Sequence, residues 1–169
     1  HSAEHNHFEI CQHLLCCIED KNPVNEFGET PLHIAAEFGH AKICQLIMDY
    51  IIIKNPRDNA GKTPLHYSAE EGHLQICKLI LSGFEDKNPE DDNGNTPLHN
   101  AAKSGHFEIC KVILKIVDEK NPQNDEGHTL LFYAMDKVEK CIKEAIAAKD
   151  SDTGNMEDHI PKPQIKQTN

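Results

Sequence analysis

Tryptophan is absent from this sequence, and aromatic residues make up only 5% of its 169 positions. Apolar residues of all kinds reach 38%, which is little for one thick globular core but enough for a thin, layered one. No apolar run is much longer than Ile51-Ile52-Ile53. A membrane-spanning helix needs roughly 20 apolar residues. We therefore predict a layered fold that does not insert into a membrane.

Positive charge is also scarce, since 17 lysine and arginine residues face 28 acidic ones and the net charge is -11. A nucleic-acid partner needs a basic footprint on the protein, and an anionic membrane surface attracts basic segments. The charge balance therefore argues against both of these partners.

A signal peptide is missing from the first ten residues, which are polar and rich in histidine. We expect an intracellular protein, either cytoplasmic or nuclear. Because the chain begins with His1 rather than methionine, we interpret it as a piece of a longer protein.

The seven cysteines lack the pattern of a disulfide framework. Five of them occupy one recurring position, at intervals of 33 residues that shorten to 31 at the end: Cys11, Cys44, Cys77, Cys110 and Cys141. Equivalent residues of stacked helices lie about 8–10 Å apart, whereas a disulfide needs Cα atoms within about 7 Å. We therefore expect small buried apolar residues in a reducing compartment. No role is assigned to Cys16 and Cys17.

What the sequence does contain is a strict 33-residue period. The segments ETPLHIAAEFGHAKICQLI, KTPLHYSAEEGHLQICKLI and NTPLHNAAKSGHFEICKVI begin at Glu29, Lys62 and Asn95. A fixed period of this length indicates structural repeats. One such unit cannot bury its own apolar face, so neighbouring units must stack.

Each unit begins with the signals of a short helix. Thr30 is a good N-cap and Pro31 suits the first helical position, while His33 can reach back to the threonine hydroxyl. Gly39 is expected to end this helix in the left-handed conformation. A second helix follows, with a wide apolar arc that includes Ile43 and Ile47, so we expect it to be buried against neighbours on both sides.

The pattern G-x-T-P-L-H-x-A-A-x-x-G-H in these segments closely resembles that of the ankyrin repeat family. The resemblance implies an all-α solenoid of stacked helix-turn-helix units, with projecting β-turn tips and a concave binding surface. The expected units are a truncated N-terminal repeat over 1–24, repeats over 25–57, 58–90 and 91–123, a degenerate C-terminal capping repeat over 124–149, and a disordered tail over 150–169.

The first and last units depart from the pattern. The first is expected to enter midway through its first helix at His1 to Glu4, with Asn6 in place of the usual glycine. The last reads Thr129-Leu130-Leu131-Phe132 and so loses both proline and histidine. Its second helix keeps a one-sided apolar stripe, as a terminal cap should.

The connecting loops also depart from the family, which usually has valine before the loop asparagine. Lysine stands there instead, as Lys21, Lys54, Lys87 and Lys120. We expect an apolar residue three positions earlier to plug the core, with the lysine stems lying over the surface; these residues are Ile18, Ile51, Phe84 and Val117. In the family the loop asparagine can be hydroxylated by an asparaginyl hydroxylase. Here each one precedes proline, unlike the usual context: Asn22, Asn55, Asn88 and Asn121.

Function is expected at positions that vary between repeats and that line the family's concave groove and tips. The candidate partner-binding residues are Phe27, Glu29, Glu37, Phe38, Lys62, Tyr67, Glu70, Glu71, Asp92, Asn95, Asn100, Lys103, His128 and Tyr133. Four aromatic candidates are expected to be binding hot spots: Phe27, Phe38, Tyr67 and Tyr133. The acidic ones predict a partner with a basic or amphipathic surface. The alternative is that all are solvated surface residues without a partner.

No catalytic motif is present: the sequence lacks G-x-S-x-G, a phosphate-binding glycine loop and H-E-x-x-H. Six of the twelve histidines belong to the repeated T-P-L-H and Gly-His motifs, where we expect capping roles. His1, His5, His7 and His13 cluster near Cys11, but Cys11 belongs to the buried series and no paired ligand loop follows. We therefore predict no enzyme activity, no metal site and no cofactor.

The predicted function is a protein interaction module, a scaffold or adaptor that acts as a monomer through its groove and tips. Two alternatives stay open. The chain could be a non-catalytic regulatory array of a larger enzyme or channel, or a structural spacer in a longer solenoid.

Overall fold

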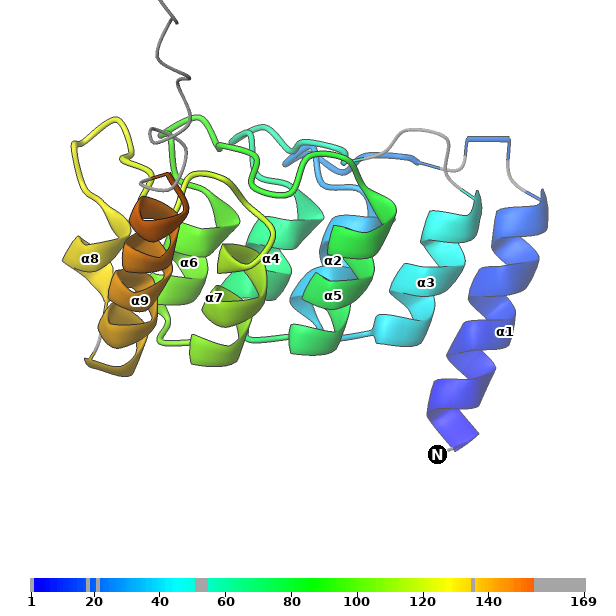
Figure 1. Ribbon diagram of the computed structural model, residues 1–169. Helices are drawn as coiled ribbons and strands as arrows, with labels where there is room; N and C mark the ends of the chain where they lie inside the picture. Colours follow the sequence, from blue (N-terminus) through cyan, green and yellow to red (C-terminus); the bar gives the residue numbers. More distant parts are fainter. Residues whose placement is uncertain (1, 18, 21, 51–54, 135, 154–169) are drawn as a thin grey trace, which may run out of the picture.

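A computed structural model describes residues 2–17, 19–20, 22–50, 55–134 and 136–153. Its helices lie in two layers, an inner and an outer one, and the loops gather along one edge (Figure 1). Within each layer every helix packs on the next one along the stack. The described part has no strand beyond one isolated bridge, between Gln123 and Thr129. The predicted all-α solenoid of stacked helix pairs is confirmed.

The inner layer comprises α2 (Pro31–Glu37), α4 (Pro64–Glu70), α6 (Pro97–Lys103) and α8 (Leu130–Tyr133). The outer layer comprises α1 (Ser2–Cys17), α3 (Ala41–Tyr50), α5 (Leu74–Gly83), α7 (Phe107–Leu114) and α9 (Asp136–Thr153). Leucines and small residues of the inner helices meet isoleucines and cysteines of the outer helices in one continuous core.

The predicted helix starts are confirmed, and their histidines do more than cap. Thr30 precedes α2 as its N-cap, and its backbone N–H donates to Nδ1 of His33 at 3.0 Å. Because Nδ1 accepts, the proton lies on Nε2, which donates to the carbonyl of Lys62 in the next unit at 3.1 Å. His66 repeats both contacts, with the carbonyl of Asn95 in the next unit. His99 repeats the first contact, but its Nε2 bonds to the carbonyl of Pro122 in the loop of its own unit. His33 and His66 therefore join consecutive units.

The Gly-His pairs between the two helices of a unit form corners that bond to the preceding unit rather than to the next one. Gly39 and Gly72 have φ of +76° and +82°, which confirms the left-handed stop predicted for Gly39. Nε2 of His73 lies 2.9 Å from the carbonyl of Glu37, at the end of the preceding inner helix, and His106 bonds to Glu70 in the same way. Each corner thus satisfies a carbonyl that the helix end leaves unpaired.

The three central cysteines of the series, Cys44, Cys77 and Cys110, are fully buried. All seven cysteines are free thiols. Cys11 and Cys141, in α1 and α9 at the two ends of the outer layer, are only half-buried, because each packs against a neighbour on one side. The predicted burial is therefore confirmed in the middle of the stack and is wrong at its ends.

Thiol labelling at pH 8 should distinguish these positions. Burial raises the pKa of Cys44 and Cys110 to about 12 and that of Cys77 to about 11, so their reactive thiolates are scarce. We expect a maleimide to modify exposed Cys16 and Cys17 first and to leave the three buried thiols intact until urea is added. Peptide mass spectrometry reads each site, and native-state labelling of Cys77 would contradict the packing.

Two connecting lysines hold helix ends rather than lying loosely over the surface. The ammonium of Lys120 donates to the carbonyls of Leu114, at 2.6 Å, and Val117. Lys87 donates in the same way to Leu81 and Phe84. Phe84 and Val117 are buried as predicted, with 3% and 8% exposure. Their counterparts Ile18 and Ile51, like Lys21 and Lys54, lie outside the described residues.

Both ends differ from the sequence prediction. Instead of a break at Asn6, α1 is one helix from Ser2 to Cys17, because no glycine is present there to reverse the chain. At the other end α9 continues past residue 149 to Thr153, into the segment predicted to be disordered. The good helix formers Ala147, Ala148 and Lys149 lead into this last turn, and the next glycine is Gly154. The rest of the predicted tail lies outside the described residues.

Candidate functional site

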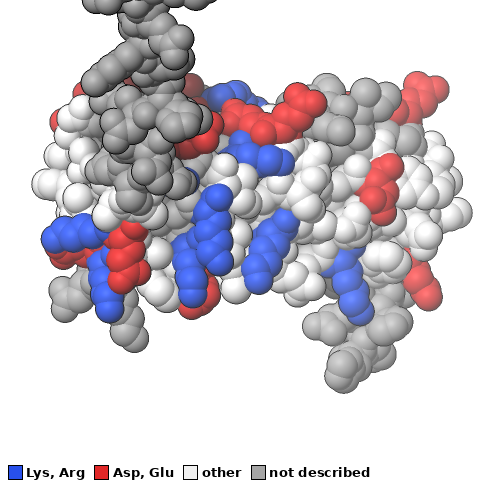
Figure 2. Space-filling view, in the orientation of Figure 1, with Lys and Arg blue, Asp and Glu red and all other residues white. Residues whose placement is uncertain are grey.

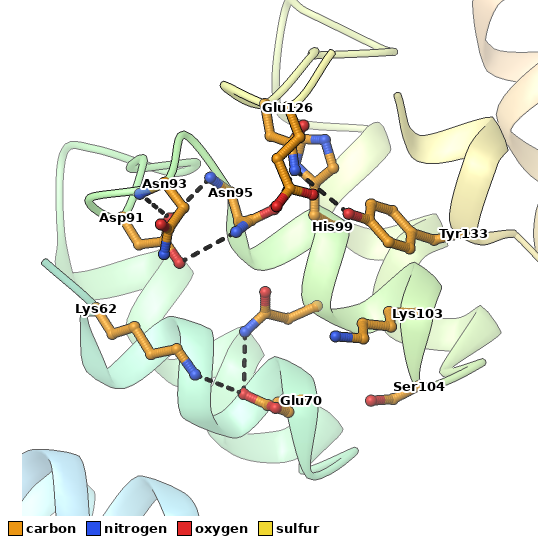
Figure 3. A pocket seen from close by; sticks show the side chains of 12 residues that line it. Lys62, Glu70, Asp91, Asn93, Asn95, His99, Lys103, Ser104, Glu126 and Tyr133 are labelled. Atoms are coloured by element: carbon orange, nitrogen blue, oxygen red, sulfur yellow. Dashed lines mark hydrogen bonds and ion pairs between the residues drawn. The ribbon is translucent and has the colours of Figure 1, made fainter. Parts of the chain in front are cut away.

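Six of the candidate residues line one polar pocket of about 310 Å³. They are Lys62, Glu70, Asn95, Asn100, Lys103 and Tyr133. The four tips are the turns over residues 25–29, 58–62, 91–95 and 124–128. The pocket lies where the third and fourth tips meet the inner helices α4, α6 and α8, and its labelled side chains converge from these elements (Figure 3).

Six further residues line the pocket without having been named as candidates. They are Asp91, Asn93, His99, Ser104, Asn124 and Glu126. Asp91 and Asn124 are 8% and 6% exposed and hold their tips together by accepting backbone N–H bonds. The recurring Asx at the start of each tip, Asn25, Asp58, Asp91 and Asn124, was the available signal, because such residues organise turns.

A short polar chain crosses the wall of the pocket. Nζ of Lys62 lies 3.0 Å from Oε2 of Glu70, and the amide of Asn100 donates to the same oxygen at 3.1 Å. The Lys62 ammonium also lies 5.3 Å from the ring centre of Tyr67. Glu70 is therefore engaged on two sides within the protein, by the tip of its own unit and by the inner helix of the next.

The two tyrosines are structural contacts rather than freely exposed rings. The Tyr67 hydroxyl donates to Asp58 at 2.7 Å and to Glu29 at 2.9 Å, and its ring meets His33 edge-on. Burial and these two carboxylates raise the pKa of Tyr67. The Tyr133 hydroxyl lies 3.1 Å from Nδ1 of His128. Both hydroxyls are therefore engaged within the protein, and the role of the two rings as binding hot spots stays a prediction.

The two phenylalanines among the candidates are open to solvent. Phe27 in the first full tip and Phe38 after α2 are 61% and 62% exposed. The carboxylate of Glu37 lies in the same region. Partial burial, followed by the negative charges of Glu29, Glu71 and Glu70, raises the pKa of Glu37, and Lys62 opposes this. The N-terminal half of the concave face is therefore apolar and acidic together.

The remaining candidates include Asp92 in the third tip and His128 in the C-terminal capping repeat. Asp92 is exposed, and its backbone N–H donates to the carbonyl of Ala60, which links two tips. His128 stacks on the exposed ring of Phe132 with 3.8 Å between the ring centres and pairs with Glu126 at 3.0 Å. Partner binding by all these residues stays a prediction.

The outer layer carries charges of both signs. Lysines are exposed on α3, α5, α7 and α9, and Figure 2 shows basic and acidic side chains together on this face. The carboxylates around Glu37 belong to the inner helices and the tips.

No group of three histidine, cysteine or acidic side chains within the described part of the chain could hold a metal ion. The side chains of His1, His5 and His7 lie outside that part. None of the helices that the structure describes is long and apolar enough to cross a bilayer.

Stacked helix pairs with tips along one edge define a solenoid repeat protein, whose extended surface is its binding feature. The description "Ankyrin repeats (3 copies)" belongs to the family model that matches residues 1–91 and 83–155. The chain therefore belongs to the ankyrin repeat family, and repeats of this family generally mediate protein-protein interaction. No curated protein matches the chain.

Proposed function

We propose that this chain is a scaffold or adaptor that binds another protein through its concave face and tips. The observation that supports this is the pair of exposed phenylalanines, Phe27 and Phe38, beside the acidic group that raises the pKa of Glu37. Exposed aromatic rings are typical anchors of protein interfaces. A partner segment that is both basic and apolar would complement this surface.

The test is affinity capture with a variant confined to this surface: Phe27→Ala, Phe38→Ala, Glu37→Lys and Glu71→Lys. Tyr67 and Glu70 are left intact because they hold neighbouring side chains. A protein captured by the parent should be lost by this variant, since both the anchors and the complementary charge are removed. Circular dichroism should show an unchanged fold, because these side chains are exposed or nearly so.

The matched control replaces two exposed apolar residues by alanine and two exposed glutamates by lysine, in the outer helices or directly after one of them. These are Leu14→Ala, Ile116→Ala, Glu9→Lys and Glu144→Lys. The control should capture the same protein as the parent, with weaker capture at high salt. Equal capture by all three forms would reject the concave face as the binding surface. No capture by any form would reject the proposal and favour a spacer.

A further inference from the structure

The four tips share one arrangement at their first residue. Each tip begins with Asn or Asp, whose Oδ1 accepts backbone N–H groups of its own tip. The partner of the other side-chain atom differs between tips, and in the first tip Nδ2 of Asn25 donates to Glu29 at 2.8 Å. In the second full tip this atom is Oδ2 of Asp58, which accepts the Tyr67 hydroxyl at 2.7 Å. In the last tip Asn124 donates to the Tyr133 hydroxyl at 3.3 Å and to Asn95 at 2.8 Å.

Asp91 has no tyrosine beside it, although its Oδ1 accepts the backbone N–H groups of Asn93 and Asn95. Its Oδ2 is 3.5 Å from the amide of Asn95, a distance at which a hydrogen bond is marginal. Asp91 is nevertheless only 8% exposed. A carboxylate this buried with a poorly satisfied oxygen is costly, and Figure 3 shows that oxygen turned toward the open middle of the pocket.

The cause is one variable position of the inner helix, which is Ile34 in the first full unit. Asn100 occupies the position that is Tyr67 one unit earlier and Tyr133 one unit later. Asparagine is too short to reach the tip, and its amide turns to Glu70 instead. The pocket of about 310 Å³ is thus the space that a tyrosine ring would fill, and the oxygen that the phenol would satisfy lies at its wall.

The rest of the lining is rich in hydrogen-bond acceptors. Glu70 and Glu126 add two carboxylates; Glu70 already contacts Lys62 and Asn100, and Glu126 contacts His128. Oδ1 of Asn100 is an acceptor because its amide nitrogen is the donor to Glu70. Of the two lysines, Lys62 is paired with Glu70. Lys103 is exposed on a long stem, so its ammonium is free to turn toward solvent.

We propose that this pocket binds the guanidinium group of an arginine side chain presented by a protein partner. A guanidinium is planar, carries five donors and pairs with carboxylates through two parallel bonds. A tyrosine of the partner would fill the same space, but it would offer one donor to a site with three carboxylates. The inference rests on the proposed binding of a protein at the concave face, and it names one anchor of that partner.

The probe is N-acetyl-arginine amide, titrated into the ¹⁵N-labelled chain and followed by NMR. We expect saturable shifts at the side-chain amide of Asn100 and at the backbone amides of Asn93 and Asn95. For a ligand of this size the Kd should be on the order of a millimolar. The neutral analogue N-acetyl-citrulline amide should bind at least about tenfold more weakly, because it lacks the charge. N-acetyl-tyrosine amide is the third probe, and it tests whether a tyrosine side chain binds the pocket instead.

Two variants localise the effect. Asp91→Asn keeps the tip intact, because asparagine stands at this position in two other tips, and it should weaken arginine binding by about tenfold or more. Asn100→Tyr should fill the pocket, donate to Asp91 as Tyr67 does to Asp58, raise the Tm and abolish the shifts. Asn100→Ala keeps the pocket open but removes one acceptor, so it should bind arginine more weakly than the parent and more tightly than Asn100→Tyr.

Absence of saturable shifts up to about 0.1 M probe would show a pocket filled by solvent only and would overturn the proposal. Preference for the tyrosine probe, or arginine binding that survives both Asp91→Asn and Asn100→Tyr, would also overturn it. These results would leave the proposed function standing if capture still depends on Phe27 and Phe38. If arginine binds but no protein is captured, the arginine pocket stands and the proposed protein-binding function fails.

Discussion

Acidification from pH 7 to pH 4 is expected to remove a large part of the stability of this protein. Burial lowers the pKa of His66 from 6.5 to about 4, and it also lowers the pKa of His33 and His99. The native state keeps these rings neutral, while the unfolded state protonates them. Their contribution is therefore complete above pH 6.5 and falls below that value, and the part that comes from His66 is fully lost below about pH 4.

The expected size is large because the same contact recurs in three units. His66 alone accounts for about 3 kcal/mol between pH 7 and pH 4, against a total of about 5–15 kcal/mol for a typical domain. Protonation of Nδ1 would also break the bond from the N-cap threonine in each unit. Urea unfolding at half-unit pH steps measures this loss directly.

The matched control for acid unfolding is His40→Gln. His40 belongs to a Gly-His corner but is exposed, so its replacement should leave the pH dependence of the urea midpoint unchanged. By contrast, His66→Gln should make that dependence shallower, at the cost of a lower midpoint at pH 7. A midpoint that stays constant from pH 7 to pH 4 would contradict the role assigned to the buried histidines.

Gly72→Ala is expected to destabilise the protein by about 2–4 kcal/mol. Gly72 has φ of +82°, and a Cβ there would lie 2.6 Å from the His106 ring. That ring is held by its bond to the Glu70 carbonyl at 2.9 Å. An added methyl group would therefore strain the backbone and displace a contact between units. Urea unfolding followed by circular dichroism gives the difference.

Gly83→Ala provides the comparison for Gly72. Gly83 ends α5 without a positive φ, and a Cβ there would meet only the terminal methyl of Met48. That methyl can rotate away, and alanine favours the helix by up to about 1 kcal/mol relative to glycine. The variant should therefore unfold within about 1 kcal/mol of the parent. Similar losses for both variants would reject the explanation based on the left-handed corner.

The sequence by itself determined the repeated unit. The 33-residue period, the Thr-Pro helix start and the left-handed glycine depend on residues close together in the chain. Their physical causes, which are a capped amide, a fixed proline φ and a missing Cβ, act within one helical turn. The buried leucines and alanines follow as well, because stacking identical units places equivalent faces in contact.

Only the tertiary structure decided what the variable residues do. Tyr67 bonds to Glu29 across 38 positions of sequence, and no local rule distinguishes such a ring from an exposed one like Phe38. The pocket beside Asp91 likewise exists because one unit has asparagine where its neighbours have tyrosine. Such features depend on the fit between side chains of different units, and that fit is set by their distances in the folded stack.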